Sequence, residues 1–524
     1  MIGTDTLTGT MQETSVRSGR LMHCHAATDV PTVEGSDLTG QDESVLRPLG
    51  DVPPDVLRAH LHRLADWVAD YRETIESRAI VTAVAPGDVS ANLPGTLPDR
   101  PESLDSILAD LDAVVMPGIV HWGHPAFLGY FGSTSNGPAL LGEIAAAALN
   151  VSAMTWRTSP AATEVETVMG AWIRQMLGLP DVFFGIVYDT ASIAIVHALA
   201  AARERAGTAV RSRGLAGRPD LPAHRVYASE QAHGSIEKAM IVLGLGEANL
   251  VRVATDAELR LDVASLQTAI LADLARGFRP MAVVATVGTT STASVDPVAD
   301  IAAVCRTHGA WLHVDAAYGG ALGILPEGQW AMAGVDQAES VVVNPHKWLF
   351  VPLDFSVLYT RHPDLLRAVF SLTPEYLRGD ASASGAIDYM DYGIQLGRRF
   401  RALKAWMAFR AMGRDGIATR IREHCRLARL FAGFVDADPA FTREAPVSMA
   451  VVCFRYAPPA LDAHAIDRLN EEIVARVNAS GDAYITWTRL RGRSVMRVGF
   501  GNVLTTQRHV ERVWRRIRAE AGVT

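Results

Sequence analysis

Lys347 follows a short run of β-branched residues and a proline, and it precedes a second apolar strand, predicted at residues 355–359. The valine run at 341–343 is typical of a strand buried on both faces, and Asn344-Pro345 ends it. A lysine at such a place is costly unless its ammonium is paired or its pKa is lowered. A partly desolvated amine is neutral for more of the time and can attack a carbonyl, which is the chemistry of a Schiff-base lysine. The alternative is a surface lysine whose alkyl chain lies along the sheet edge.

Four other predicted strands also end at residues that could bind or polarise a ligand. These strands span residues 183–188, 225–228, 281–287 and 310–314, and the valine run adds a fifth at 340–343. In an open parallel sheet, ligands bind beyond the carboxyl ends of the strands, so the residues that follow the strands belong to one region. In chain order they provide helix-start N–H groups, an imidazole, a hydroxyl turn, a carboxylate and an amine: Thr190 and Ala191, His233, Thr290, Asp315 and Lys347.

Together these groups suit a pyridine aldehyde that carries a phosphate. The lysine would form the Schiff base, the aspartate would keep the ring nitrogen protonated, and the helix start would bind the phosphate. Each residue alone also has an ordinary structural explanation, such as the capping of a helix by Thr190. The set serves a metal ion poorly, and the glycine-rich turn of a nicotinamide site is absent.

The composition limits the partners that we expect. The chain of 524 residues is 49% hydrophobic and 20% charged, which is typical of a globular protein. A net charge of −8 argues against a nucleic-acid partner. The four cysteines form no Cys-x-x-Cys pair, so we expect neither a disulfide framework nor a zinc ribbon. Since no secretory signal and no membrane-spanning apolar stretch is visible, the sequence predicts a cytoplasmic protein without a membrane or metal partner.

The chain divides into four predicted parts. Residues 1–45 are polar and lack periodicity, which predicts a disordered leader. Residues 46–130 contain two helical patterns around a proline-rich linker, and the apolar stripe of this arm predicts packing on a partner subunit. Helical patterns alternate with short apolar strands in 131–412, which predicts a large α/β domain with a mainly parallel sheet. Residues 413–524 read as a small C-terminal α+β domain.

Several motifs make the chain similar to a known family. They are MPGIVHWGHPAFLGYF (116–131), SPAATEVE (159–166), the turn at 229–235, HVDAAYGG (313–320), NPHKW (344–348) and LGRRFRALK (396–404). With them the sequence resembles, over about residues 50–520, the group II pyridoxal-phosphate decarboxylases, and most closely the aromatic-L-amino-acid decarboxylase family. The resemblance implies pyridoxal 5'-phosphate (PLP) as the cofactor and PLP fold type I, with a mainly parallel seven-stranded sheet covered by helices. It also implies a homodimer with its active sites at the interface.

The resemblance further assigns roles to single residues. Lys347 would hold the cofactor, and Asp315 would pair with its pyridinium nitrogen. His233 and Ala317 would lie against the two faces of the ring. The remaining residues would contact the phosphate, the ring or the substrate carboxylate: Thr190, Ala191, Asn344, Thr290, Ser133 and His346.

Tyr376 lies in a polar, Gly- and Ser-rich stretch that reads as a lid. In the family, a tyrosine in this lid returns the proton to Cα, whereas relatives with phenylalanine there oxidise the substrate to an aldehyde. A phenol is a plausible acid and a phenyl group is not. Trp122, Phe127 and Met154 are expected around an apolar substrate ring.

The sequence therefore predicts a PLP-dependent decarboxylase of an aromatic L-amino acid: tryptophan, tyrosine, dopa or phenylalanine. Three alternatives stay open at this point. They are an aromatic aldehyde synthase, a decarboxylase of a non-aromatic amino acid such as glutamate or histidine, and an inactive paralogue that binds the cofactor. Asp189 and Ile193 stand where many relatives have glycine and glutamate, beside the predicted phosphate site. A carboxylate there is unfavourable unless it points away or caps a helix, so it bears on cofactor affinity.

Overall fold

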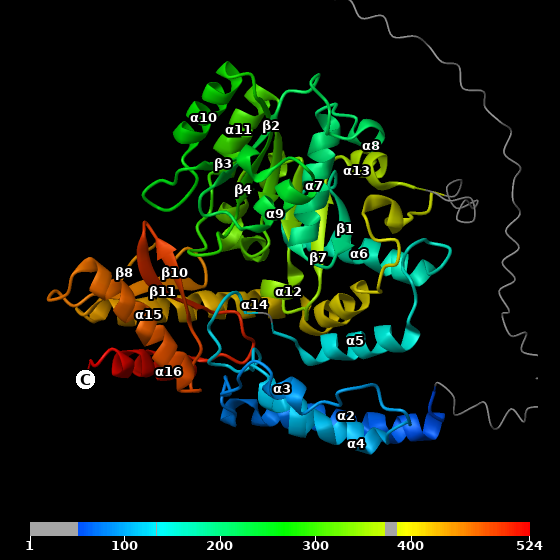
Figure 1. Cartoon of the computed structure of the whole chain (residues 1–524), viewed down its shortest axis with the longest axis vertical. Coiled ribbons are helices and arrows are strands. Elements are labelled where there is room, and N and C mark those ends of the chain that lie inside the picture. Colours follow the sequence, from blue (N-terminus) through cyan, green and yellow to red (C-terminus); the bar gives the residue numbers. More distant parts are fainter. Residues whose placement is uncertain (1–50, 133, 373–384, 524) are drawn as a thin grey trace, which may run out of the picture. The chain divides into compact units, whose positions relative to one another are not determined.

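Figure 1 shows the computed structural model, which describes residues 51–132, 134–372 and 385–523. The predicted leader and two predicted site residues, Ser133 and Tyr376, therefore lie outside the described residues. The chain divides into two compact units, Met1–Asp70 and Tyr71–Thr524. The described part of the first unit consists mainly of helix α2 (Pro54–Thr74), which continues into the second unit.

A seven-stranded, mainly parallel sheet forms the centre of the second unit. Its strands are β1 (Phe184–Tyr188), β2 (His224–Ser229), β3 (Leu250–Val253), β4 (Arg279–Thr286), β5 (Trp311–Asp315), β6 (Ser340–Val343) and β7 (Ser356–Thr360), in the order β1-β7-β6-β5-β4-β2-β3. Five neighbouring strands, β6, β5, β4, β2 and β3, are parallel to one another. Strand β7 is antiparallel to both of its neighbours, β6 and β1. The predicted fold class is confirmed. Only β3 lacks a counterpart among the strands expected from the sequence.

Before β1 the chain forms the helices α3 (Asp88–Ala91), α4 (Leu104–Asp110), α5 (Gly137–Leu149) and α6 (Pro160–Met176). The helices that lie between the strands or follow the last one are α7 (Ala191–Arg205), α8 (Val210–Arg213), α9 (Ser235–Val242), α10 (Val263–Ala275), α11 (Val298–His308), α12 (Pro345–Trp348) and α13 (Pro363–Phe370). Side-chain caps fix several of their starts. Asn136 accepts the N–H group of Ala139 at the start of α5, and Ser159 accepts that of Ala162 at the start of α6.

Helices pack on both faces of the large sheet. Consecutive residues of a strand point to opposite faces, and β1 shows the consequence. Ile186 and Tyr188 pack in the hydrophobic cluster that contains residues of α7 and α9, whereas Val187 packs in the cluster that contains residues of α10 and α11. Because both faces are covered, all four residues of β6 are buried. This burial explains why the strands are continuous apolar runs rather than alternating ones.

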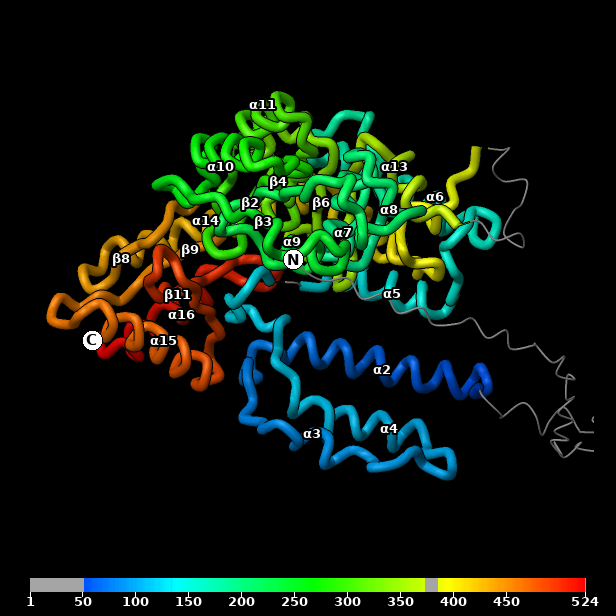
Figure 2. The backbone as a smooth tube through the Cα atoms, turned by 45° about the horizontal axis from the view of Figure 1, so that its top comes forward, coloured from blue at the N-terminus to red at the C-terminus, as the bar shows by residue number. Residues whose placement is uncertain are grey.

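The C-terminal residues of the second unit, which we call the small domain, form a four-stranded antiparallel sheet. The division of the chain into four parts stays a prediction. Its strands β8 (Phe441–Arg443), β9 (Val451–Tyr456), β10 (Thr486–Leu490) and β11 (Arg493–Gly499) have the order β10-β11-β9-β8. Helices α15 (Ala463–Ala479) and α16 (Gln507–Glu520) accompany them (Figure 2). The long helix α14 (Ala402–Ala437) contacts α5 and α6 of the large domain as well as β8, β9 and α16, and it is interrupted at Gly413, where φ is 63°.

Within residues 51–132, 134–372 and 385–523, no helix is both long and apolar enough to cross a bilayer. The same residues contain no group of three or more His, Cys, Asp or Glu side chains that could hold a metal ion.

Candidate active site

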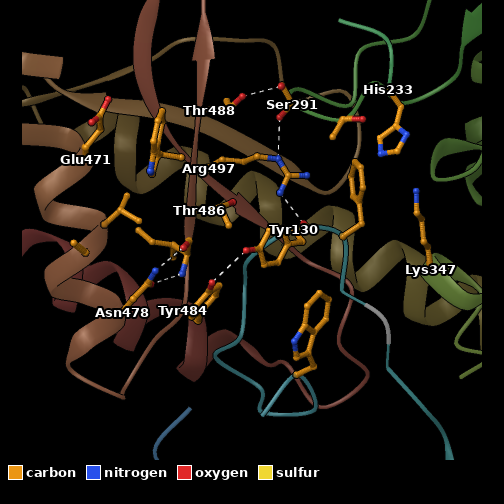
Figure 3. Close-up of a pocket in the computed structure, with 17 residues that line it drawn as sticks. Tyr130, His233, Ser291, Lys347, Glu471, Asn478, Tyr484, Thr486, Thr488 and Arg497 are labelled. Carbon is orange, nitrogen blue, oxygen red and sulfur yellow. Dashed lines mark hydrogen bonds between the residues drawn. The ribbon is translucent and has the colours of Figure 1, made fainter. Parts of the chain in front are cut away.

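A pocket with a cavity volume of about 620 Å³ opens beside Lys347 (Figure 3). Four of the predicted site residues line it, and they are Lys347, His233, Thr290 and Trp122. A second group of lining residues comes from the C-terminal domain and includes Glu471, Asn478, Tyr484, Thr486, Thr488 and Arg497. The pocket therefore lies between the carboxyl ends of the large sheet and the small domain.

The amine of Lys347 is desolvated, which favours its neutral form. Pro345 begins the short helix α12, and the backbone N–H of Lys347 donates to the carbonyl oxygen of Asn344 over 2.9 Å. Burial lowers the pKa of Lys347, the carboxylate of Asp315 opposes that shift, and Arg497 adds to it. Among the described residues, no hydrogen-bond or ion-pair partner holds the Nζ atom, which lies 5.2 Å from the centre of the Phe131 ring. A desolvated, unpaired amine is what covalent attachment to an aldehyde requires.

Asp315 ends strand β5 and is 6% exposed. Its Oδ1 atom accepts the backbone N–H of Ala317 over 3.0 Å, and no lysine or arginine of the described chain forms an ion pair with it. The nearby His313 does not supply the missing charge, because burial lowers its pKa to about 4. A buried carboxylate without a cation is costly. The protonated ring nitrogen of PLP would provide that cation, so this carboxylate fits the cofactor.

His233 lies in the turn after β2. Its Nδ1 atom accepts the backbone N–H of Ser235 over 3.1 Å and lies 2.8 Å from the Ser235 hydroxyl. This pattern leaves the proton of the neutral ring on Nε2. Burial lowers the pKa of His233, which favours the neutral ring. In Figure 3 the imidazole lies on the same side of the pocket as the amine of Lys347.

The predicted phosphate contacts meet where β1 and β7 pair. Tyr188 of β1 pairs with Ser356 of β7. The hydroxyl of Ser356 donates to Oδ1 of Asn344 over 2.7 Å and lies 3.3 Å from the carbonyl oxygen of Asp189. Helix α7 begins just beyond, and Thr190 caps it by accepting the N–H of Ile193 over 3.5 Å. These bonds hold Asn344 next to the start of α7, so both could contact one phosphate.

Ala317 and His346 are tied into the same backbone framework. The carbonyl oxygen of Ala317 accepts the N–H of Asn344 over 3.1 Å, which links the end of β5 to the lysine-bearing loop. His346 is buried, and its Nδ1 atom accepts the N–H of Phe355 over 3.0 Å. Burial, with a smaller contribution from Lys347, lowers the pKa of His346 to about 3, so this ring is neutral.

The substrate residues predicted from the sequence are only partly brought together. Trp122 lines the pocket, and Phe127 stacks behind it with ring centres 4.7 Å apart. Met154 is not among the lining residues, and its carbonyl oxygen accepts the N–H of Met390 over 3.0 Å. Two unpredicted residues, Tyr130 and Tyr484, complete the aromatic wall; the Tyr130 ring stacks on Trp122 with centres 5.4 Å apart.

Arg497 and Phe131 are further lining residues that the sequence did not single out. The Phe131 ring lies between two basic side chains, 5.2 Å from Nζ of Lys347 and 4.7 Å from the guanidinium carbon of Arg497. Arg497 is 4% exposed and donates to the carbonyl oxygens of Tyr130 and Ser291 over 2.6 and 3.0 Å. Its Nη2 atom is buried without a hydrogen-bond partner among the described residues. An unsatisfied guanidinium N–H group in the wall is a candidate for binding an anionic group of the substrate.

A buried ion pair fastens the end of β1. Glu166 and Arg398 are each 4% exposed in their side chains and lie 2.5 Å apart. Glu166 accepts the N–H of Val187, and Arg398 donates to the carbonyl oxygens of Val187 and Ala153. The two motifs at 159–166 and 396–404 thus meet on the strand that leads to Asp189 and Thr190. The pair positions the phosphate end of the site without touching the pocket.

Comparisons with known proteins agree with this geometry. The family model described as the pyridoxal-dependent decarboxylase conserved domain matches residues 86–457. The chain is 37% identical to phenylacetaldehyde synthase of Arabidopsis thaliana, over 91% of this chain and 98% of that protein. It is also 37% identical to tryptophan decarboxylase 2 of Oryza sativa subsp. japonica, over 93% of this chain and 98% of that protein. A crystal structure of Oryza sativa TDC with PLP and tryptamine superposes with a TM-score of 0.86 at 36% identity, covering 90% of this chain and 98% of that chain.

A match of this length, joined to a desolvated lysine, a buried carboxylate that needs a cation and a fold type I sheet, identifies the chain as a member of the pyridoxal-phosphate-dependent decarboxylase family.

Proposed function

We propose that this protein decarboxylates aromatic L-amino acids to the arylalkylamine and CO₂. The observation that carries the proposal is the meeting of the Lys347 amine with an aromatic wall in one pocket. Trp122, Tyr130 and Tyr484 line that pocket and offer flat apolar surface to an indole or phenol ring. Relatives that are 36–37% identical and span nearly the whole chain include enzymes named for tryptophan and for tyrosine.

The roles proposed for the described residues follow from their surroundings. When bound, PLP supplies an electron sink for the electrons left at Cα by the departing CO₂. Lys347 would hold the cofactor through its amine, whose pKa is lowered by burial. Asp315 would keep the ring nitrogen of the bound cofactor protonated. His233 presents its Nε2–H group, and Arg497 offers its unsatisfied N–H group to a carboxylate.

A proton must return to Cα after CO₂ leaves, and we propose Tyr376 as its donor. This residue lies outside the described residues, so its role rests on the sequence. The alternative is aldehyde formation, because one relative is named phenylacetaldehyde synthase. A tyrosine at position 376 favours the amine, because a phenol can deliver a proton to Cα before oxygen reacts there.

We also propose a homodimer. Helix α5 carries Leu141, Ile144 and Leu149, whose exposed fractions are 59%, 44% and 59%. Leu93 and Leu97 in the preceding arm are 46% and 90% exposed. Exposed apolar side chains in this number mark an interaction surface rather than a solvated one. Light scattering on the purified protein would show twice the chain mass.

A cytoplasmic location stays a prediction.

The product assay tests the proposed reaction. Purified protein with added PLP is incubated separately with L-tryptophan, L-tyrosine, L-dopa, L-phenylalanine, L-histidine and L-glutamate, and amine, aldehyde and CO₂ are quantified. Equal amounts of amine and CO₂ from an aromatic substrate support the proposal. Aldehyde with ammonia would show that Tyr376 does not act as argued. Turnover of glutamate or histidine alone would show that the substrate is a non-aromatic amino acid, while the proposed decarboxylation with PLP would still hold.

A further inference from the structure

The start of α7 already carries a negative charge of its own. Oδ1 of Asp189 accepts both the backbone N–H of Thr190, over 2.5 Å, and its hydroxyl, over 3.1 Å. The other oxygen, Oδ2, accepts the side-chain amide of Gln395 over 3.1 Å. The carboxylate of Asp189 is thus held by three donors. Two of them belong to the residue that the sequence predicts to bind the cofactor phosphate.

Other donors at this place remain available. No hydrogen-bond acceptor is recorded among the described residues for the N–H groups of Ala191 and Ser192, the first two residues of α7. Asn344 lies beside them through the Ser356 hydroxyl. The helix start can therefore still receive an anion, and its dipole favours one. A phosphate placed there would share the Thr190 donors with a carboxylate of the same sign.

We propose that Asp189 acts as an internal competitor of the cofactor phosphate and lowers the affinity of this enzyme for PLP. The inference rests on the proposed function, since it takes the start of α7 as the phosphate site. For the phosphate to use the Thr190 donors, the Asp189 carboxylate must give them up while Gln395 holds its other oxygen. The two anions also repel each other across a partly buried space, where screening is weaker than in water.

The effect is specific to the phosphate and not to the pyridine ring. Asp189→Asn keeps a side-chain oxygen that can accept the Thr190 N–H, but it removes the charge. One like-charge contact in partly screened surroundings changes a dissociation constant by about tenfold or more. We therefore expect Asp189→Asn to bind PLP about tenfold more tightly than the wild type. Pyridoxal, which has no phosphate, should bind equally to both proteins.

The experiment measures dissociation constants of PLP and pyridoxal for the full-length apoprotein by absorbance titration. Asp189→Asn is compared with Asp181→Asn, which removes an equal charge from a side chain that is 94% exposed. Tighter PLP binding in Asp189→Asn alone, with pyridoxal unchanged, is the expected result. An equal gain for both ligands, or no gain for PLP, would overturn the proposal and make Asp189 an ordinary part of the helix start.

Two additions keep the outcome unambiguous. Thermal unfolding of the apoproteins shows whether Asp189→Asn folds, and Gln395→Ala is a second variant that releases the carboxylate without removing it. We expect Gln395→Ala to tighten PLP binding by a smaller factor than Asp189→Asn does, and weaker binding would count against the competition.

Lys347→Ala distinguishes a failure of the proposed function from a failure of the proposed competition. If no variant shows a cofactor band that depends on Lys347, the proposed function fails, whereas a Lys347-dependent band that Asp189→Asn leaves unchanged overturns only the competition.

Discussion

The two ends of the proposed cofactor site differ in how their charges are satisfied. At the lysine–aspartate end, Lys347 and Asp315 are drawn out of water and have no ion-pair partner among the described residues. At the phosphate end, the Thr190 donors are already bound by the carboxylate of Asp189. At the first end, the cofactor would supply the partners that the buried lysine and aspartate lack. At the second end, phosphate binding would require breaking the contact between Asp189 and Thr190. We infer that covalent attachment contributes more than phosphate binding to holding PLP in this enzyme.

Removal of the amine at position 347 should have the largest effect. Lys347→Ala loses the covalent link, so the lysine-dependent absorbance band should vanish and turnover should fall by a factor of about 10³ or more. Lys238→Ala, which removes an exposed lysine from α9, is the control and should keep both. A Lys347→Ala protein that still forms a reducible cofactor adduct would place the chemistry on another lysine.

The next effect concerns the carboxylate at the end of β5. Asp315→Asn keeps the shape of the side chain but cannot sustain a positive ring nitrogen. We expect kcat to fall by about 10²- to 10³-fold, the usual loss for one buried electrostatic stabiliser. The cofactor band should remain. Asp300→Asn on the exposed side of α11 serves as a control and should retain wild-type kcat. Equal kcat values for the two variants would remove Asp315 from the mechanism.

The phosphate end can be loosened without altering its donors. Glu166→Gln leaves Arg398 buried without its partner charge, and breaking a buried pair in this way costs about 3–5 kcal/mol of unfolding free energy. Denaturant unfolding measures the loss. Glu164→Gln, two residues earlier on the same helix, should change stability little, since Glu164 is exposed. A loss below about 1 kcal/mol for Glu166→Gln would mean that the pair does not hold β1.

The smallest effect is expected from pH. Burial lowers the pKa of His313 to about 4, below the usual 6.5, so the folded protein binds fewer protons than the unfolded chain between these values. Stability from this group is present above pH 6.5 and is lost as pH falls towards 4, by about 1 kcal/mol per pH unit. His313→Asn should therefore show a shallower decline in unfolding free energy over this range. An identical slope would mean that His313 is not held neutral.

The strand-end residues could be proposed from the sequence because their chemistry follows local patterns. Thr190, His233, Thr290, Asp315 and Lys347 each come just after a predicted strand, and parallel strands bring their ends together by topology alone. Strand β3 was missed because it is short and only one of its four residues is buried. Such an edge strand has no strong apolar signal.

The wall opposite Lys347 could not be predicted in the same way. Arg497 and Tyr484 come from the small domain, and their place in the pocket depends on how that domain packs on the large one. The motifs around Glu166 and Arg398 were recognised, yet their pairing joins residues 232 positions apart and carries no local signal. Long-range pairs of charges become visible only in the folded structure.

The most direct test of the central claim uses L-tryptophan and L-tyrosine labelled at the carboxyl carbon, with the wild type and Lys347→Ala side by side. We expect labelled CO₂ and the matching amine in equal amounts from the wild type, and neither product from Lys347→Ala. Labelled CO₂ accompanied by aldehyde instead of amine, or no CO₂ from either substrate in PLP-loaded protein, would contradict the claim.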